Sequence, residues 1–226
     1  MKHILTFFIT VLFFSCDNEK ILQLPEISNS KTTEIDDISP AYLFYDSEKD
    51  SIELNRKNLI STTNWLVNVD KRLKLKLVIP QIKFLQNKKK NAGHKKEGAK
   101  NYFTCNDTSI KNLGFIEFTG TEYIEDSSVS YLSNPENSDL VYESINLKID
   151  KHSKLTLIQI DTNLVATKTD KNNLLKDLKK YDTKGFLIYL NFNENLNFQD
   201  YITYKSLLEN INLKEAKISN KEFIFN

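Results

Sequence analysis

Hydrophobic and polar positions are most regularly ordered in the last third of the chain. An apolar–polar alternation that reverses at a four-residue polar turn predicts a hairpin. Two stretches with apolar residues three and four positions apart predict helices, and a continuous apolar run between them predicts a strand covered on both faces. In chain order these are strands 145–150 and 155–160, a helix capped by Asp170 that reaches Tyr181, strand 186–190, helix 201–211, and one edge strand or a bent pair within 216–225. We therefore expect an α+β unit over residues 144–226, with the order ββαβαβ and both helices on one face of a small mixed sheet.

A second and less regular α+β unit is expected over residues 41–122. Its elements are a hairpin over 42–54, strand 65–70, a helix over 78–86 with Pro80 in its first turn, and short strands 102–105 and 115–119. Leu73, Leu75 and Leu77 alternate with polar residues, which favours extending strand 65–70 to residue 77, although a helix that begins near Ser61 is the competing interpretation. The polar residues 123–143 indicate a connection between the two units.

The hairpins of the two units resemble each other. Each has a short apolar strand that ends in an aspartate, Asp46 or Asp150, followed by a four-residue turn and an alternating strand. A degenerate duplication would explain the likeness. Chance similarity between two hairpins in a chain rich in strands is the alternative, and both interpretations stay open at this point.

The first sixteen residues follow a different pattern. Lys2 and His3 precede the apolar run 4–14, which is shorter than the roughly 20 residues that a membrane-spanning helix needs. A short basic start, a short apolar run and the small residue Ser15 before Cys16 are features of a secretion signal. We expect residues 1–15 to be a cleaved signal peptide. A plain signal peptide with an incidental cysteine is the alternative.

The tetrapeptide Phe13-Phe14-Ser15-Cys16 resembles the lipobox of bacterial lipoproteins. This resemblance implies that Cys16 becomes the new N-terminus and carries a diacylglycerol and palmitate-type acyl chains, which anchor the protein to a membrane of the cell envelope. The outer membrane is favoured, with either its periplasmic or its surface face. Residues 16–40 are polar and have no continuing apolar period, so we expect them to form a lipidated flexible tether.

Composition limits the function without identifying it. The chain has 31 basic and 30 acidic residues and a formal charge of +1, so nothing in its charge favours nucleic acid as a partner. If Cys16 is acylated, Cys105 cannot form an internal disulfide, and a buried position on a strand is its simplest explanation. Neither His94 nor His152 has a second ligand residue at metal-binding spacing. We therefore expect a protein that is not an enzyme and has no catalytic residue, no cofactor and no metal.

The strongest local feature is the basic stretch from Lys83 to Lys100. Within this stretch only Glu97 opposes the lysines, and two glycines indicate a mobile loop. Such a cluster attracts anionic groups, for example those of an acidic glycan or a lipid. A solvated loop that keeps the protein soluble is the alternative. The candidate anion-binding residues are Lys88, Lys89, Lys90, His94, Lys95, Lys96 and Lys100.

The last third also resembles the periplasmic domain of the ExbD/TolR family of biopolymer transporters. The likeness rests on the order of the elements and on the stretches 145–150, 155–157, 174–178 and 186–190, together with Tyr201, Leu207, Leu208 and Ile218. It implies the fold and an accessory role in an envelope energy-transduction or transport complex, in which an exposed sheet edge pairs with a strand of a protein partner. The apolar run 4–14 lacks the acidic residue of the family's membrane helix, and His152-Ser153 stands where the family has Asp-Gly. Our first hypothesis is therefore a lipid-anchored, non-catalytic binding or scaffolding module, and the accessory subunit is the alternative.

Overall fold

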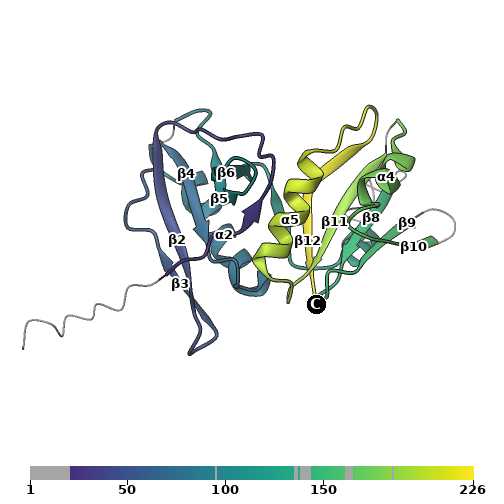
Figure 1. Cartoon of the computed structure of the whole chain (residues 1–226), viewed down its shortest axis with the longest axis horizontal. Coiled ribbons are helices and arrows are strands. Elements are labelled where there is room, and N and C mark those ends of the chain that lie inside the picture. Colours follow the sequence, from purple (N-terminus) through teal and green to yellow (C-terminus); the bar gives the residue numbers. More distant parts are fainter. Residues whose placement is uncertain (1–20, 95, 135–136, 138–143, 161–164, 185) are drawn as a thin grey trace, which may run out of the picture.

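The computed structural model describes residues 21–94, 96–134, 137, 144–160, 165–184 and 186–226, and these form two mixed six-stranded sheets with helices. The α+β class predicted from the sequence is confirmed. The first sheet contains β1 (Glu26–Ile27), β2 (Ile38–Asp46), β3 (Ser51–Asn55), β4 (Asn64–Val69), β5 (Asn101–Asp107) and β6 (Asn112–Glu117), and α2 (Leu75–Lys90) connects β4 to β5. Figure 1 shows the two sheets side by side with the long C-terminal helix α5 (Phe198–Glu209) between them.

The second sheet has the strand order β10-β9-β8-β11-β12-β7. Its elements are β7 (Glu122–Ile124), α3 (Ser128–Ser133), β8 (Ser144–Ile149), β9 (Leu155–Ile160), β10 (Val165–Thr169), α4 (Leu174–Leu178), the 3₁₀ turn η3 (Lys179–Tyr181), β11 (Leu187–Asn193), α5 and β12 (Lys217–Phe225). The expected order ββαβαβ is present with one further strand, β10, after the hairpin. Strand β12 was expected at an edge, but it lies between β11 and β7.

The helices of the second half contact both faces of their sheet, whereas one face was expected. Buried residues of α4 and α5 join Ile188 and Leu190 of β11 in the main hydrophobic core. Tyr189 lies between these two residues and therefore points to the opposite face, where it packs with Leu132 of α3 and Phe223 of β12. The expected connection 123–143 thus contributes a strand and a helix to the second half in its described part.

The two halves repeat one topology. The first sheet contains the strand order β3-β2-β4-β5, and the second contains β9-β8-β11-β12. In each, an antiparallel hairpin is followed by a parallel strand, a helix and a further parallel strand. The likeness of the two hairpins therefore extends to the whole strand–helix unit.

Reciprocal backbone hydrogen bonds join the halves where each long helix begins. The bonds come in pairs that are related by an offset of 123 residues. For example, residues 75 and 196 form one bond, and their counterparts 198 and 73 form the other. The donor–acceptor pairs are Leu75 N to Leu196 O (3.0 Å), Phe198 N to Leu73 O (2.7 Å), Lys76 N to Glu194 O (2.8 Å) and Gln199 N to Lys71 O (3.1 Å). Lys74 and Asn197, which are also 123 apart, form the isolated bridge at the centre. The junction is therefore a pseudo-two-fold pairing of the chain with itself.

The same local turn positions both sides of this junction. The Oδ1 atom of Asp70 accepts a hydrogen bond from Arg72 N (3.0 Å), and the Oδ1 atom of Asn193 accepts one from Asn195 N (2.9 Å). Asp and Asn are the residues whose side chains close such turns onto the backbone two positions later. The leucine that follows each turn is fully buried. Strand, turn and helix are therefore specified alike in both halves.

A shared core completes the contact between the halves. Phe103 of β5 packs edge-on against Phe198 and Tyr201 of α5, with ring centroids 5.2 and 6.2 Å apart. The buried Tyr201 hydroxyl donates to Oε2 of Glu222 (2.8 Å) and is 3.1 Å from the hydroxyl of Tyr123. Lys205 forms an ion pair with the same buried Glu222 carboxylate. This network satisfies polar groups that would otherwise be costly to bury.

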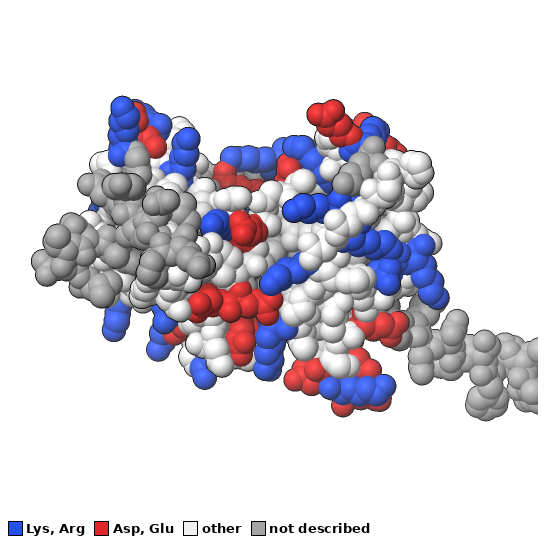
Figure 2. All heavy atoms as spheres, turned by 180° about the vertical axis from the view of Figure 1, so that it is seen from behind, with Lys and Arg blue, Asp and Glu red and all other residues white. Residues whose placement is uncertain are grey.

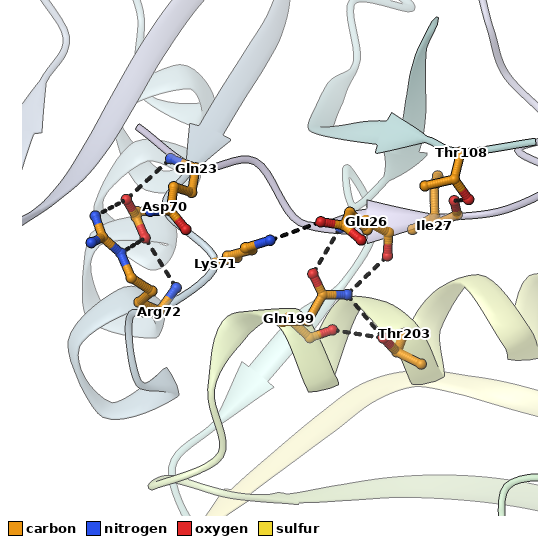
Figure 3. Close-up of polar contacts among 9 residues, drawn as sticks. All are labelled: Gln23, Glu26, Ile27, Asp70, Lys71, Arg72, Thr108, Gln199 and Thr203. Carbon is orange, nitrogen blue, oxygen red and sulfur yellow. Dashed lines mark hydrogen bonds and ion pairs between the residues drawn. The ribbon is translucent and has the colours of Figure 1, made fainter. Parts of the chain in front are cut away.

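The segment expected to be a flexible tether is held against the body from Gln23 onward, so that prediction was wrong for its described part. Gln23 N donates to Oδ2 of Asp70 (3.2 Å), and Gln23 O accepts from Lys71 N (2.8 Å). Figure 3 shows that Glu26 then exchanges two hydrogen bonds with the side chain of Gln199 on α5. Strand β1 adds to β5 in parallel, so the unpaired edge of a strand supplies backbone partners that composition alone does not reveal. Cys16 lies outside the described residues.

Two further expectations on α2 were wrong. The strand does not continue to residue 77, because the Asp70 turn ends β4 and the helix begins at Leu75. Pro80 consequently lies inside the helix and not in its first turn. The spacing of Ile79, Ile82 and Leu85 in the sequence predicts one buried face of this helix, and all three residues are buried.

Replacing Gly114 with alanine is expected to destabilise the first sheet. A Cβ atom at this position would lie 2.7 Å from Cβ of Ser30, which is closer than real Cβ contacts, so the N-terminal segment has to shift. We expect a loss of about 1–3 kcal/mol in the free energy of unfolding, measured by urea denaturation. Gly120→Ala is the matched control, because open space surrounds that position. Equal midpoints for the two variants would contradict the packing described.

Replacing Lys205 with methionine is expected to cost about 3–5 kcal/mol of unfolding free energy, because it leaves the buried Glu222 carboxylate without its cation. Adding Glu222→Gln should recover much of this loss, since the amide is neutral and still accepts from Tyr201. The exposed pair of Lys180 and Asp177 is the control, and Lys180→Met should cost less than about 1 kcal/mol. A cost at Lys205 as small as that at Lys180 would contradict the assignment.

Candidate functional site

A pocket of about 580 Å³ lies beside the C-terminal half of α2, where the two halves meet. Its walls come from α2, from the loop that leads to β5, and from residues 119–123, which lead into β7 of the second sheet. Four ammonium groups and one carboxylate line it, those of Lys83, Lys89, Lys90, Lys96 and Glu122. Most other lining side chains are amides and hydroxyls. The volume lies within the usual range for small-molecule sites.

The lysines at 88–90 lie on the last turn of α2, and not in a loop as the sequence suggested. Cations are favoured at this end of a helix because the unpaired carbonyl groups there carry partial negative charge. The corresponding helix α5 has 12 residues, whereas α2 has 16, so α2 is one turn longer. The basic turn is therefore an addition to the repeated unit of the fold.

Lys89 is the most strongly held of these lysines. Its Nζ donates to Lys100 O (2.8 Å), Asn101 Oδ1 (2.9 Å) and Thr63 O (3.1 Å), and it lies 5.1 Å from the centre of the Trp65 ring. Partial burial lowers the pKa of the Lys89 ammonium to about 8. Lys89 therefore ties the end of α2 to the beginnings of β4 and β5, and it supplies charge at the base of the pocket.

Three other lysines of the basic stretch are ion-paired with carboxylates from distant strands and loops. The pairs are Lys83 with Glu125 (2.6 Å), Lys96 with Asp37 (2.7 Å) and Lys100 with Glu117 (2.7 Å). Glu97 is the acidic residue within the stretch itself, but the fold brings three more carboxylates to it from elsewhere. Basic and acidic side chains are likewise interspersed over the face shown in Figure 2.

The structure separates the remaining candidate residues. Lys88, Lys90 and His94 are exposed, and Lys90 lines the pocket whereas Lys88 and His94 do not. Lys95 lies outside the described residues. Asn101, Glu122 and Tyr123 line the pocket and were missed, because they reach it from β5 and β7. No local sequence signal marks them.

Cys105 is fully buried within β5, as its sequence context indicated. Its thiol donates to Phe103 O (3.9 Å), and burial raises the pKa of the thiol well above its ordinary range. His94 and His152, in contrast, are exposed. Within the described ranges, no three His, Cys, Asp or Glu side chains are grouped to hold a metal ion, and no helix has the length and apolar character to cross a bilayer.

Comparison with known proteins found no matching family model, no matching curated protein and no matching solved structure.

Lys89 should make stability depend on pH in the alkaline range. Its pKa is about 8 in the folded chain, below the ordinary value of 10.5, so the unfolded chain binds more protons between these values. The contribution of Lys89 to the free energy of unfolding therefore rises as the pH increases from 8 to 10.5. We expect the unfolding free energy of the wild type to rise over this range relative to that of Lys89→Met. Parallel curves for the two proteins would contradict the lowered pKa.

Proposed function

We propose that this protein is a lipid-anchored, non-catalytic binding module of the cell envelope that captures an anionic group in the pocket beside α2. The observation that carries the proposal is the group of four lysines, from α2 and from the loop that follows it, which line a pocket at the junction of the two halves. Lys89 and Lys90 have no carboxylate partner in the ion pairs of the described residues, so the positive charge there is only partly neutralised. An anionic ligand would neutralise the remaining positive charge.

The repeated topology provides an internal comparison. The segment between α5 and β12 comprises residues 210–216 and contains one lysine and one glutamate. The equivalent segment of the first half comprises residues 91–100, follows an extra basic turn of helix, and contains three lysines and one glutamate. Because the second half folds without these additions, the fold itself does not require them. This favours a role in binding.

The anchoring part of the proposal rests on the resemblance of residues 13–16 to a lipobox. The alternative, an accessory subunit of an ExbD/TolR-type complex, would need an open sheet edge for its protein partner. Strand β10 is at an edge of the second sheet, and four of its five residues are exposed. No contact in the described residues favours this alternative over the binding module.

Retention on immobilised dextran sulfate tests the binding site. The double variant Lys90→Glu/Lys96→Glu should elute at a clearly lower salt concentration than the wild type, because it reverses two charges at the pocket. Lys214→Glu/Lys217→Glu is the matched control, since it makes the same charge change at exposed positions around the corresponding loop of the second half. Equal elution of the two double variants would refute an anion site in this pocket.

Fractionation of cells tests the anchor. Replacing Cys16 with alanine should move the protein from the membrane fraction to the aqueous fraction and abolish incorporation of labelled palmitate. Cys105→Ala is the control and should stay membrane-bound, because that thiol is buried in the core. Membrane association that survives Cys16→Ala would overturn the anchoring proposal.

A further inference from the structure

The charge of the pocket suits a single negative charge. Its four ammonium groups face the carboxylate of Glu122 and the ion-pair partners Glu125 and Asp37, so four positive charges meet three negative ones. A carboxylate would neutralise the remaining charge. A phosphate monoester, which is nearly dianionic at neutral pH, would leave an excess of negative charge.

The helix beside the pocket gives the same indication. Helix α2 presents its C-terminal end here, where the carbonyl groups carry partial negative charge. Phosphate groups are typically bound at the opposite, N-terminal end of helices, where backbone N–H groups point at the ligand. This partial negative charge opposes any anion, and it opposes a dianion more strongly than a monoanion, so the lysine side chains are the source of attraction.

The neutral part of the lining suits hydroxyl groups. Asn87 of α2, Ser61 and Thr121 provide amide and hydroxyl groups that both donate and accept hydrogen bonds. The Gln86 amide nitrogen already donates to Phe118 O and Thr121 O, so Gln86 offers only its carbonyl oxygen as an acceptor. The aromatic residue of the lining, Tyr123, is nearly buried, so it offers little ring surface on which a nucleobase could stack. A sugar ring that carries a carboxylate matches this combination of lysines, amides and hydroxyls, and the volume accommodates such a unit.

We infer that the pocket binds a carboxylated sugar unit. This inference rests on the proposed function, because it assumes the anion site beside α2. It adds the chemistry of the ligand.

Calorimetry on the lipidated full-length protein in phosphatidylcholine nanodiscs tests the inference, with galacturonate as the probe. Galacturonate should bind at least tenfold more tightly than its uncharged methyl ester and than galactose 6-phosphate.

Each contrary result overturns a different part. Equal binding of the methyl ester would refute recognition of the carboxylate, and equal or tighter binding of galactose 6-phosphate would refute the preference for a monoanion. These results leave the dextran sulfate test unaffected, so failure of the inference is distinguishable from failure of the proposed function.

Discussion

The reciprocal pairing of Leu73 and Leu75 with Leu196 and Phe198 is the constraint on which the rest of the structure depends. It fixes the start of each long helix against the turn of the other half. With these starts fixed, α5 lies against β5, and Phe103 meets Tyr201 in a common core. The same arrangement brings β7 of the second sheet to the side of α2, which completes the pocket. The two halves therefore form one folding unit rather than two independent domains.

Elements with strong local patterns were predictable. The run 186–190 is a central strand, and the hairpin at Asp150 and the helix around Tyr204 are where the alternation and the helical spacing placed them. Errors arose where a distant partner decided the outcome. Leu73 alternates like a strand residue, but the Asp70 turn redirects the chain. Residues 23–27 have the composition of a linker, but an open strand edge orders them.

The basic stretch shows how much can be predicted from the charges of neighbouring residues in the sequence. The lysines themselves identified one wall of the pocket, since composition and clustering are properties of neighbouring residues. Their neutralisation was not predictable, because Asp37 and Glu125 come from segments more than 40 positions away. The repeat was also only half visible. The two hairpins suggested the repeat. The equivalence of Asp70 and Asn193 becomes clear only in the structure, where each side chain closes the same kind of turn.

Trp65 is the chain's single tryptophan, and it lies against the Lys89 ammonium with its indole N–H donating to Ile60 O (2.7 Å). Any change in the charge or position of that ammonium alters the electric field across this one indole. The protein consequently contains its own spectroscopic reporter, because its indole emission comes from one site next to Lys89, with no contribution from a second indole elsewhere in the chain.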